Sequence, residues 1–209
     1  MKQGYIYTIL FTLVISAFFS TLLAITNAGY LPTIQRNQEL ALKKVILDVL
    51  GIRVSSDAEV EAIFQRSITR QNIANLDVYV YFQDGVVEGY AIPMSGPGLW
   101  GTIRGYVGVS PDGSRLLGLG FTEHSETPGL GGRIDESWYK EQFRSLEVSE
   151  GSPITYGGSG KGVDAITGAT ASSNRYKQAI ERALESAKSK EKQNKYFDGI
   201  FQGRSKADN

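Results

Sequence analysis

Hydrophobic residues are arranged in three ways along this chain, and each arrangement predicts a different kind of element. Residues 4–25 form an apolar run without a single charged side chain. Residues 33–52 and 176–187 carry apolar side chains at spacings of three and four, the period of an amphipathic helix. Residues 76–94 and 102–124 are rich in alternating apolar positions, as strands are. The pattern therefore predicts helices towards both ends and a sheet between them.

The first run is long enough to cross a membrane. The 22 residues from Gly4 to Ile25, at about 1.5 Å each, reach about 33 Å, which covers the hydrocarbon core of a bilayer. Tyr5, Tyr7 and Tyr30 flank the run where interfacial aromatic residues are expected. We therefore expect a retained transmembrane helix.

A cleaved signal peptide is the alternative for the same residues. Lys2 resembles the basic start of such a peptide, and Ala24 and Ala28 are small residues near its end. The apolar run is longer than the usual core of about 7–15 residues, so the retained helix is favoured. Both interpretations export the rest of the chain, but Arg36, Lys43 and Lys44 weaken any orientation drawn from charge bias.

Four further helices are predicted. The first follows Pro32 and ends at Gly51, and the second spans residues 56–66 with Ser56 or Asp57 as its cap. The third is short and led by Asp135. The last begins near Ser172 and Ser173, with Tyr176, Ile180, Ala183, Leu184 and Ala187 on one face.

Two hairpins are predicted between these helices. Asp84-Gly85 interrupts the first alternating segment and Pro111-Asp112-Gly113 the second. The expected fold class is α+β: an antiparallel sheet with packed helices, preceded by a single N-terminal transmembrane helix. The expected organisation is an anchor at 1–30, a domain at 31–195 and a polar tail at 196–209.

Composition narrows the possible functions. Lys plus Arg and Asp plus Glu each total 22, so the chain has no overall basic charge that would favour nucleic acid. There is no cysteine, which excludes disulfides, thiolate-held clusters and cysteine nucleophiles. With His124 as the single histidine, the usual multi-histidine metal site is excluded. No metal is expected, and a carboxylate-only site is the alternative. Redox chemistry would need a bound organic cofactor.

Two glycine-rich segments resemble nucleotide-binding motifs but fail on context. Residues 96–101, "GPGLWG", fit the letters of the dinucleotide fingerprint, yet a strand-like segment follows where a helix is required. Residues 157–162, "GGSGKG", have Thr155 in place of the first glycine of a phosphate loop and Gly162 in place of its Ser or Thr.

Residues 167–173, "TGATASS", lie where the last helix begins. The simplest interpretation is a capped helix, because caps use these residue types. The alternative is an anion site, since free N–H groups and the helix dipole at this end favour a phosphate. Two other glycine-rich stretches at strand ends, residues 95–105 and 123–134, favour a ligand site built from loops.

Together the three stretches resemble the FMN-binding domain shared by two subunit families. These are the G subunit of Rnf-type ion-translocating ferredoxin:NAD oxidoreductases and the C subunit of sodium-translocating NADH:quinone oxidoreductases. The family motif, S/T-G-A-T-x-S/T, reads Thr167-Gly168-Ala169-Thr170-Ala171-Ser172 here. The resemblance implies that Thr170 carries FMN covalently through a phosphoester.

The resemblance also implies roles for neighbouring residues. Thr167 and the helix-mouth amides would hold the phosphate. Independently of the resemblance, the position of Asp164 before the turn suits it to orient the turn or to hold a neighbouring hydroxyl. The loops would wall the flavin ring with apolar side chains and with glycine backbones whose N–H groups meet the ring edges, while Glu126 and Thr127 bond its polar atoms. The expected cofactor-binding residues are Thr170, Thr167, Gly168, Ala169, Ser172, Ser173, Lys161, Gly98, Leu99, Trp100, Glu126, Thr127, Gly129 and Leu130. Ordinary alternatives are a core position for Trp100, a solvated loop position for Lys161 and local hydrogen bonding for His124.

The function that the resemblance implies is electron transfer by a membrane-anchored FMN subunit, with no catalytic side chain and no activity alone. Its expected partners are the other membrane subunits of the complex, a flavin transferase and membrane lipid. The soluble domain would lie on the outer, periplasmic face of the cell (inner) membrane. Length favours the Rnf-type G subunit over its longer sodium-pump relative. The remaining alternatives are an anchored domain that binds an anionic ligand without redox chemistry, and a free-standing flavin reductase.

Overall fold

A computed structural model describes residues 2–73, 76–147, 154 and 162–192. The chain divides into two compact units, residues 1–41 and 42–209. Helix α1 (Lys2–Val49) belongs to both, since it contains residues 2–41 of the first unit and the start of the second. Its apolar part has a mean hydropathy of 2.3 and is long and apolar enough to cross a membrane.

Helix α1 continues through Pro32, where the sequence had suggested a break between two helices. That expectation was wrong. A proline inside a helix removes one backbone hydrogen bond and crowds the preceding turn, but the many turns on either side keep the helix intact. The predicted end at Gly51 is correct. Gly51 has φ +79°, and the N–H groups of Gly51 and Ile52 donate to the carbonyls of Asp48 and Leu47, a Schellman motif.

Helix α2 (Asp57–Ser67) is capped by Ser56, as predicted, because its Oγ accepts from Glu59 N. Strand β1 (Ile68–Ile73) follows without a loop. It was not predicted, since "ITRQNI" has no clear alternation. It pairs with β2 at one edge of the sheet.

The five-stranded sheet is antiparallel throughout, with its strands in chain order. The predicted fold class is confirmed. The remaining strands are β2 (Leu76–Gln83), β3 (Val86–Pro97), β4 (Thr102–Val109) and β5 (Leu116–Glu123). Both predicted hairpin turns are present. Asp84 and Gly85 have φ +48° and +84°, which is the geometry of a two-residue type I′ turn.

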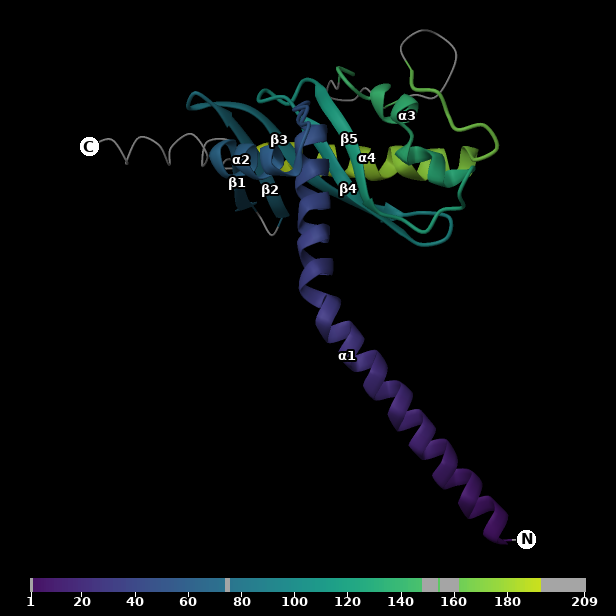
Figure 1. Cartoon of the computed structure of the whole chain (residues 1–209). Coiled ribbons are helices and arrows are strands. Elements are labelled where there is room, and N and C mark those ends of the chain that lie inside the picture. The colour runs from purple at the N-terminus through teal and green to yellow at the C-terminus, as the bar shows by residue number, and fades with distance from the viewer. Residues whose placement is uncertain (1, 74–75, 148–153, 155–161, 193–209) are drawn as a thin grey trace. The chain divides into compact units, whose positions relative to one another are not determined.

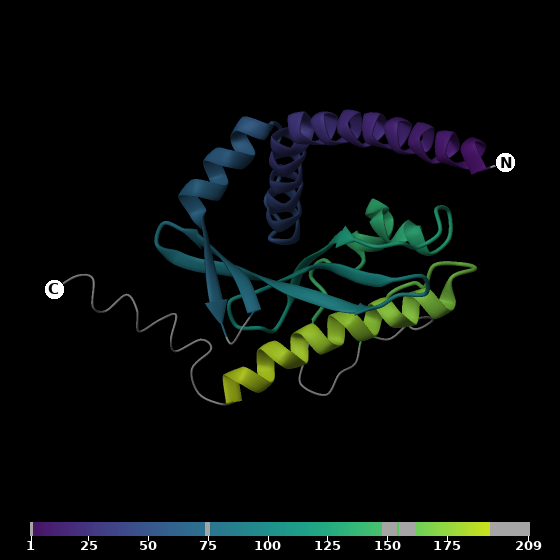
Figure 2. The same ribbon diagram turned by 90° about the horizontal axis from the view of Figure 1, so that it is seen from below.

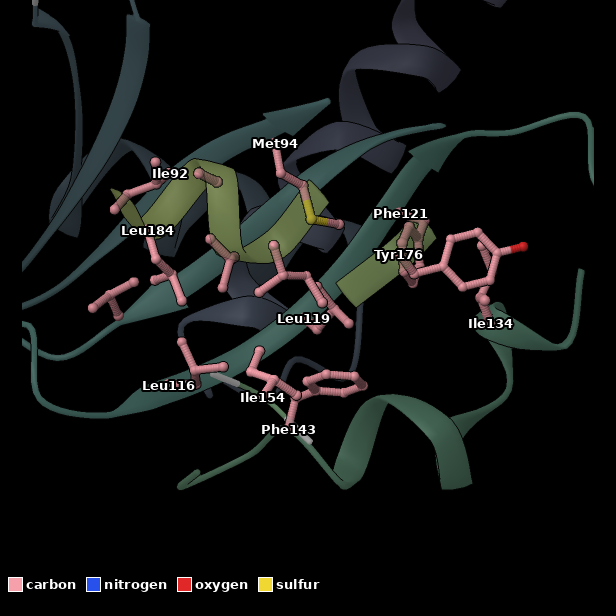
Figure 3. Close-up of a cluster of buried hydrophobic side chains, with 14 of the residues drawn as sticks. Ile92, Met94, Leu116, Leu119, Phe121, Ile134, Phe143, Ile154, Tyr176 and Leu184 are labelled. Atoms are coloured by element: carbon pink, nitrogen blue, oxygen red, sulfur yellow. The ribbon is translucent and has the colours of Figure 1, made fainter. Parts of the chain in front are cut away.

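The two faces of the sheet differ in side-chain size. Helix α4 (Thr170–Lys192) packs along β3 on one face, against large residues such as Met94, Leu119 and Phe121, which lie together in the core (Figure 3). On the other face, Gly108, Gly118 and Gly120 lie against the last turn of α1. The sheet therefore lies between α4 and the end of α1 (Figures 1 and 2).

After β5 the chain forms a 3-10 helix, η1 (Gly131–Asp135), and then α3 (Ser137–Glu141). The predicted short helix led by Asp135 is therefore shifted, because Glu136 stands at the N-cap of α3. Tyr139 and Phe143 are fully buried and extend the core beside Ile134 and Tyr176.

Candidate functional site

The first glycine-rich stretch is a hairpin loop. Pro97 and Thr102 are the last paired residues of β3 and β4, and residues 98–101 connect them. Gly98 N donates to Gly101 O at 2.6 Å, which closes the loop. A strand follows, so the dinucleotide interpretation of "GPGLWG" fails as the sequence suggested.

The hairpin loop holds two large apolar side chains in solvent. Leu99 is 50% exposed and Trp100 is 69% exposed. The alternative of a core position for Trp100 is therefore excluded. Leu130, which lies in the second stretch, is also 47% exposed.

The second stretch is a compact turn after β5. Thr127 O accepts hydrogen bonds from Leu130 N at 3.1 Å and from Gly132 N at 3.0 Å. Gly129 has φ +75°, a conformation that suits glycine. The turn leads directly into η1 and leaves the side chain of Thr127 exposed.

The third stretch is the start of α4, which begins at Thr170, two or three residues earlier than Ser172 and Ser173 suggested. The carbonyl of Ala169 accepts from Ser173 N at 2.9 Å, so Ala169 occupies the N-cap and Thr170 is the first helical residue. The side chain of Thr170 is outside the described part of the structure. Ala169 has no oxygen on its side chain, so the N-cap residue itself supplies no acceptor to the first N–H groups of the helix.

Ser173 fixes the turn that precedes the helix. Its Oγ donates to Ala169 O at 3.1 Å and accepts from Ile166 N at 3.0 Å, in a fully buried position. Gly168 has φ +80° and Thr167 is exposed beside it. The helix therefore begins after a turn that these hydrogen bonds hold and whose outer residues, Thr167 and Gly168, face solvent.

Glu126 joins the first loop to the third. Its Oε1 accepts from Leu99 N at 2.7 Å and from Trp100 N at 3.3 Å, and its Oε2 accepts from Ser172 Oγ at 3.1 Å. The second loop meets the third directly, because a Cβ added to Gly168 would lie 3.5 Å from Leu130 Cδ2. The structure thus brings the three glycine-rich stretches together.

Two residues that the sequence analysis did not place in the site also hold these loops. Arg175 Nη1 donates to Gly98 O at 2.6 Å, and Tyr176 Oη donates to Gly131 O at 3.0 Å. Both come from the second turn of α4. Tyr176 looked like a core residue from its spacing, and only its hydroxyl signals a further role; no local pattern marks Arg175.

His124 bonds locally, as the sequence analysis favoured. Its Nε2 lies 2.8 Å from Asp135 Oδ2, and its Nδ1 accepts from Glu126 N at 3.3 Å. Asp135 is therefore occupied with His124 rather than with capping α3. This contact orients the backbone at Glu126.

Other parts of the chain add little to the site. Lys161, one of the expected binding residues, lies outside the described residues, and Asp164 is exposed with its N–H on Gln142 Oε1. A hollow of about 380 Å³ lies elsewhere, lined by residues that include Met94, Arg104 and Arg182. None of its lining residues belongs to residues 98–101, 124–132 or 166–173.

Comparison with known proteins shows the family to which this chain belongs. The pattern described as the FMN-binding domain matches residues 98–185, from the hairpin loop into α4. The G subunit of the ion-translocating oxidoreductase complex of Methanosarcina acetivorans is 33% identical over 184 residues, covering 83% of this chain and 87% of that protein. The chain belongs to the FMN-binding-domain family of ion-translocating oxidoreductase subunits.

Other members of this family match over less of their length. The C subunit of the Na⁺-translocating NADH-quinone reductase of Pasteurella multocida is 35% identical over 136 residues, which cover 61% of this chain and 46% of that protein. The corresponding protein of Neisseria meningitidis serogroup B is 32% identical over 132 residues, 59% of this chain and 49% of that protein. The chain thus spans about half the length of these relatives from Na⁺-translocating reductases.

Solved structures in the family share the fold. Shewanella oneidensis NqrC superposes with a TM-score of 0.61 at 22% identity, over 72% of this chain and 91% of that one. The C subunit of the Na⁺-translocating NADH-quinone reductase of Parabacteroides distasonis gives 0.62 at 23% identity, over 74% and 93%. The antiparallel sheet with its helices is therefore the fold of this family.

Proposed function

We propose that this chain is the membrane-anchored FMN subunit of an Rnf-type ion-translocating oxidoreductase complex. It would carry FMN through a phosphoester to Thr170 and pass electrons between neighbouring centres of the complex. The observation that carries the proposal is the meeting of three loops around the first turn of α4, within a family of FMN-binding domains. The chain covers 87% of the G-subunit relative but only 46% of the C-subunit relative from Pasteurella multocida, which favours the Rnf type.

The residues present fit a flavin phosphate at the start of α4. Ala169 at the N-cap supplies no side-chain acceptor to the first N–H groups of the helix, and Gly168 and Thr167 are exposed beside them. N–H groups at the positive end of a helix bind phosphate oxygens well. Thr167, Gly168, Ala169 and Ser172 would shape this end, with the ester oxygen supplied by Thr170.

The exposed apolar side chains fit the flavin ring. Leu99, Trp100 and Leu130 are large side chains with exposed fractions of 50%, 69% and 47%. The loop of Leu130 contacts the start of α4 directly. The loop of Leu99 and Trp100 is joined to it through Glu126. Apolar and aromatic surfaces of this kind bind ring systems. They would orient the ring and exclude water from it, while the N–H of Gly98 remains committed to Gly101 O.

FMN, when bound, supplies the electron-accepting and electron-donating chemistry, and the chain supplies placement. The described residues offer no cysteine thiolate and no assembled group of metal ligands of their own. We propose that α1 anchors the domain beside its partner subunits at the membrane, with the domain on the outer face. Maturation would require a flavin transferase.

Covalent flavin tests the proposal directly. Full-length chain co-expressed with a flavin transferase should give a yellow fluorescent band after denaturing electrophoresis. Thr170→Ala should abolish the band, because no oxygen remains for the ester, and should leave the stability nearly unchanged, because Thr170 is the first helical residue and alanine is a good helix former. Thr170→Ser should retain a band, and Thr69→Ala, a change on β1, should leave it at the wild-type level.

Peptide mass spectrometry then assigns the attachment residue. The FMN mass increment should lie on the peptide that contains Thr170, with fragment ions placing it on that residue. An increment on Thr167 or Ser172 would contradict the assignment, and complete release of flavin by acid would contradict the covalent bond.

A further inference from the structure

We infer that Glu126 is a positioning residue. Its carboxylate holds the hairpin loop of residues 98–101 against the start of α4 through hydrogen bonds, and it does not contact the flavin. The inference deepens the proposed function and rests on it for the identity of the cofactor. It assigns to Glu126 a role different from that of a ligand to polar atoms of the flavin.

The carboxylate of Glu126 faces inward. Glu126 is only 5% exposed, and both oxygens already accept hydrogen bonds from the chain, at Leu99 N, Trp100 N and Ser172 Oγ. Burying a carboxylate is unfavourable unless donors of this kind surround it. Because these contacts occupy both oxygens, the carboxylate of Glu126 serves to join the hairpin loop to α4.

Two glycines make room for this carboxylate. A Cβ added to Gly98 would collide with Glu126 Oε1, and one added to Gly131 would lie 2.5 Å from Glu126 Oε2. Neither glycine has a positive φ, so close approach, not backbone conformation, is the reason for glycine at both positions. The carboxylate therefore lies between Gly98 of the hairpin loop and Gly131 of η1.

The same bonds determine where the apolar side chains point. Because the N–H groups of Leu99 and Trp100 turn inward to Glu126, the two side chains remain outward, at 50% and 69% exposure. Without an internal acceptor, nothing else described in the loop would hold these N–H groups. Arg175 strengthens the arrangement by donating to Gly98 O from α4.

The link reaches the attachment site through Ser172. Ser172 is two residues after Thr170 in the first turn of α4, and its Oγ donates to Glu126 Oε2 from a position that is 2% exposed. One carboxylate thus fixes the distance between the phosphate end and the ring end of the proposed site. Sites held by such supporting contacts lose function when the contacts loosen by about 1 Å.

Two substitutions separate geometry from charge. Glu126→Gln removes the charge but keeps an oxygen to accept from Leu99 N and Trp100 N, and its amide can donate to Ser172 Oγ. Glu126→Asp keeps the charge but is shorter by one methylene, about 1.5 Å, and cannot reach both the loop and Ser172. Glu123→Ala, which removes an exposed carboxylate at the end of β5, is the matched control.

Hydrogen exchange of residues 98–101 in full-length, flavin-free protein in detergent is the first measurement. Glu126→Asp should exchange the Leu99 and Trp100 amides about tenfold faster, the equivalent of one lost hydrogen bond. Glu126→Gln and Glu123→Ala should stay within about threefold of wild type. This readout does not require that the chain bind FMN.

Covalent loading by a flavin transferase is the second measurement. Glu126→Asp should lower the flavin fraction by about tenfold, and Glu126→Gln by about twofold or less. The inference is overturned if the Leu99 and Trp100 amides exchange no faster in Glu126→Asp than in Glu126→Gln, or if the Glu126→Asp chain takes up as much flavin as the Glu126→Gln chain or more. If wild-type chain takes up no flavin but the exchange ranking holds, the proposed cofactor fails and the positioning role of Glu126 remains.

Discussion

At the scale of single residues, Asp112 shows how one carboxylate can stabilise a turn. It lies between β4 and β5, where Oδ1 accepts from Ser110 Oγ at 2.5 Å and from Ser114 N at 3.1 Å, and Oδ2 accepts from Ser114 Oγ at 2.7 Å. These bonds, that from Ser110 foremost, favour the charged form and lower the pKa of Asp112 from 3.8 to about 2. The turn is therefore more stable when Asp112 is ionised.

This pKa predicts an acid-dependent loss of stability. Because the pKa is lower in the folded state, the contribution is present above about pH 4 and disappears as the pH falls through about 2. Asp112→Asn should lower the unfolding midpoint at pH 6, and its difference from wild type should shrink from pH 4 to pH 2. Thermal unfolding followed by circular dichroism measures both. Ser110→Ala should weaken the same pH dependence, and a difference that widens on acidification would contradict the assignment.

At the scale of elements, glycines determine how closely α1 approaches the sheet. Gly108 and Gly118 lie under the backbone of Val49, while Gly120 lies under the side chains of Val45 and Val49. A Cβ at Gly118 would be 2.9 Å from both Val49 Cα and Val49 O, atoms that cannot rotate away. At Gly120 it would meet Val45 Cγ1 at 2.8 Å and Val49 Cγ1 at 2.9 Å, which are side-chain atoms that can give way more readily than a helix backbone.

These contacts predict an order of stability among two alanine variants. Gly118→Ala should destabilise by about 1–3 kcal/mol, the usual cost of overpacking, and lower the melting temperature by about 2–4 °C for each kcal/mol. Gly120→Ala should cost less. Chemical denaturation of both variants measures the difference. Equal costs would mean that the helix backbone shifts as readily as a valine side chain.

The elements that the sequence predicted correctly are those with local signals. Ser56 caps α2, Gly51 ends α1, and Asp84-Gly85 closes a hairpin, each through chemistry within a few residues. Strand β1 escaped prediction because its pairing with β2, not its own residue pattern, makes it a strand. The break expected at Pro32 was wrong because the local cost of one proline is smaller than the stabilisation from the helical turns on either side.

The site could be predicted only in outline. The motif around Thr170 and the exposed loops were visible in the sequence, but their contacts depend on residues far apart in the chain. Glu126 and Leu99 are separated by 27 positions, and Arg175 and Gly98 by 77. No spacing rule connects such pairs, so the inward role of Glu126 and the participation of Arg175 required the fold.

At the scale of the whole molecule, the proposed function needs the domain on the outer face of a membrane and α1 retained. The chain contains no cysteine, so a single introduced cysteine reports its own location. Ala58 is exposed on α2 within the second unit, and Gly4 lies at the start of the apolar part of α1. The two positions should lie on opposite sides of the membrane.

In intact cells, a membrane-impermeant maleimide should label the Ala58→Cys chain and leave the Gly4→Cys chain unlabelled. Both should be labelled once the cells are lysed, and the Gly4→Cys chain should then have the mass of the uncleaved protein, because a retained helix keeps residue 4. Labelling of Gly4→Cys alone in intact cells would reverse the proposed orientation. Loss of residue 4 from the mature chain would instead favour a cleaved signal peptide, and with it a domain that reaches its partners without an anchor of its own.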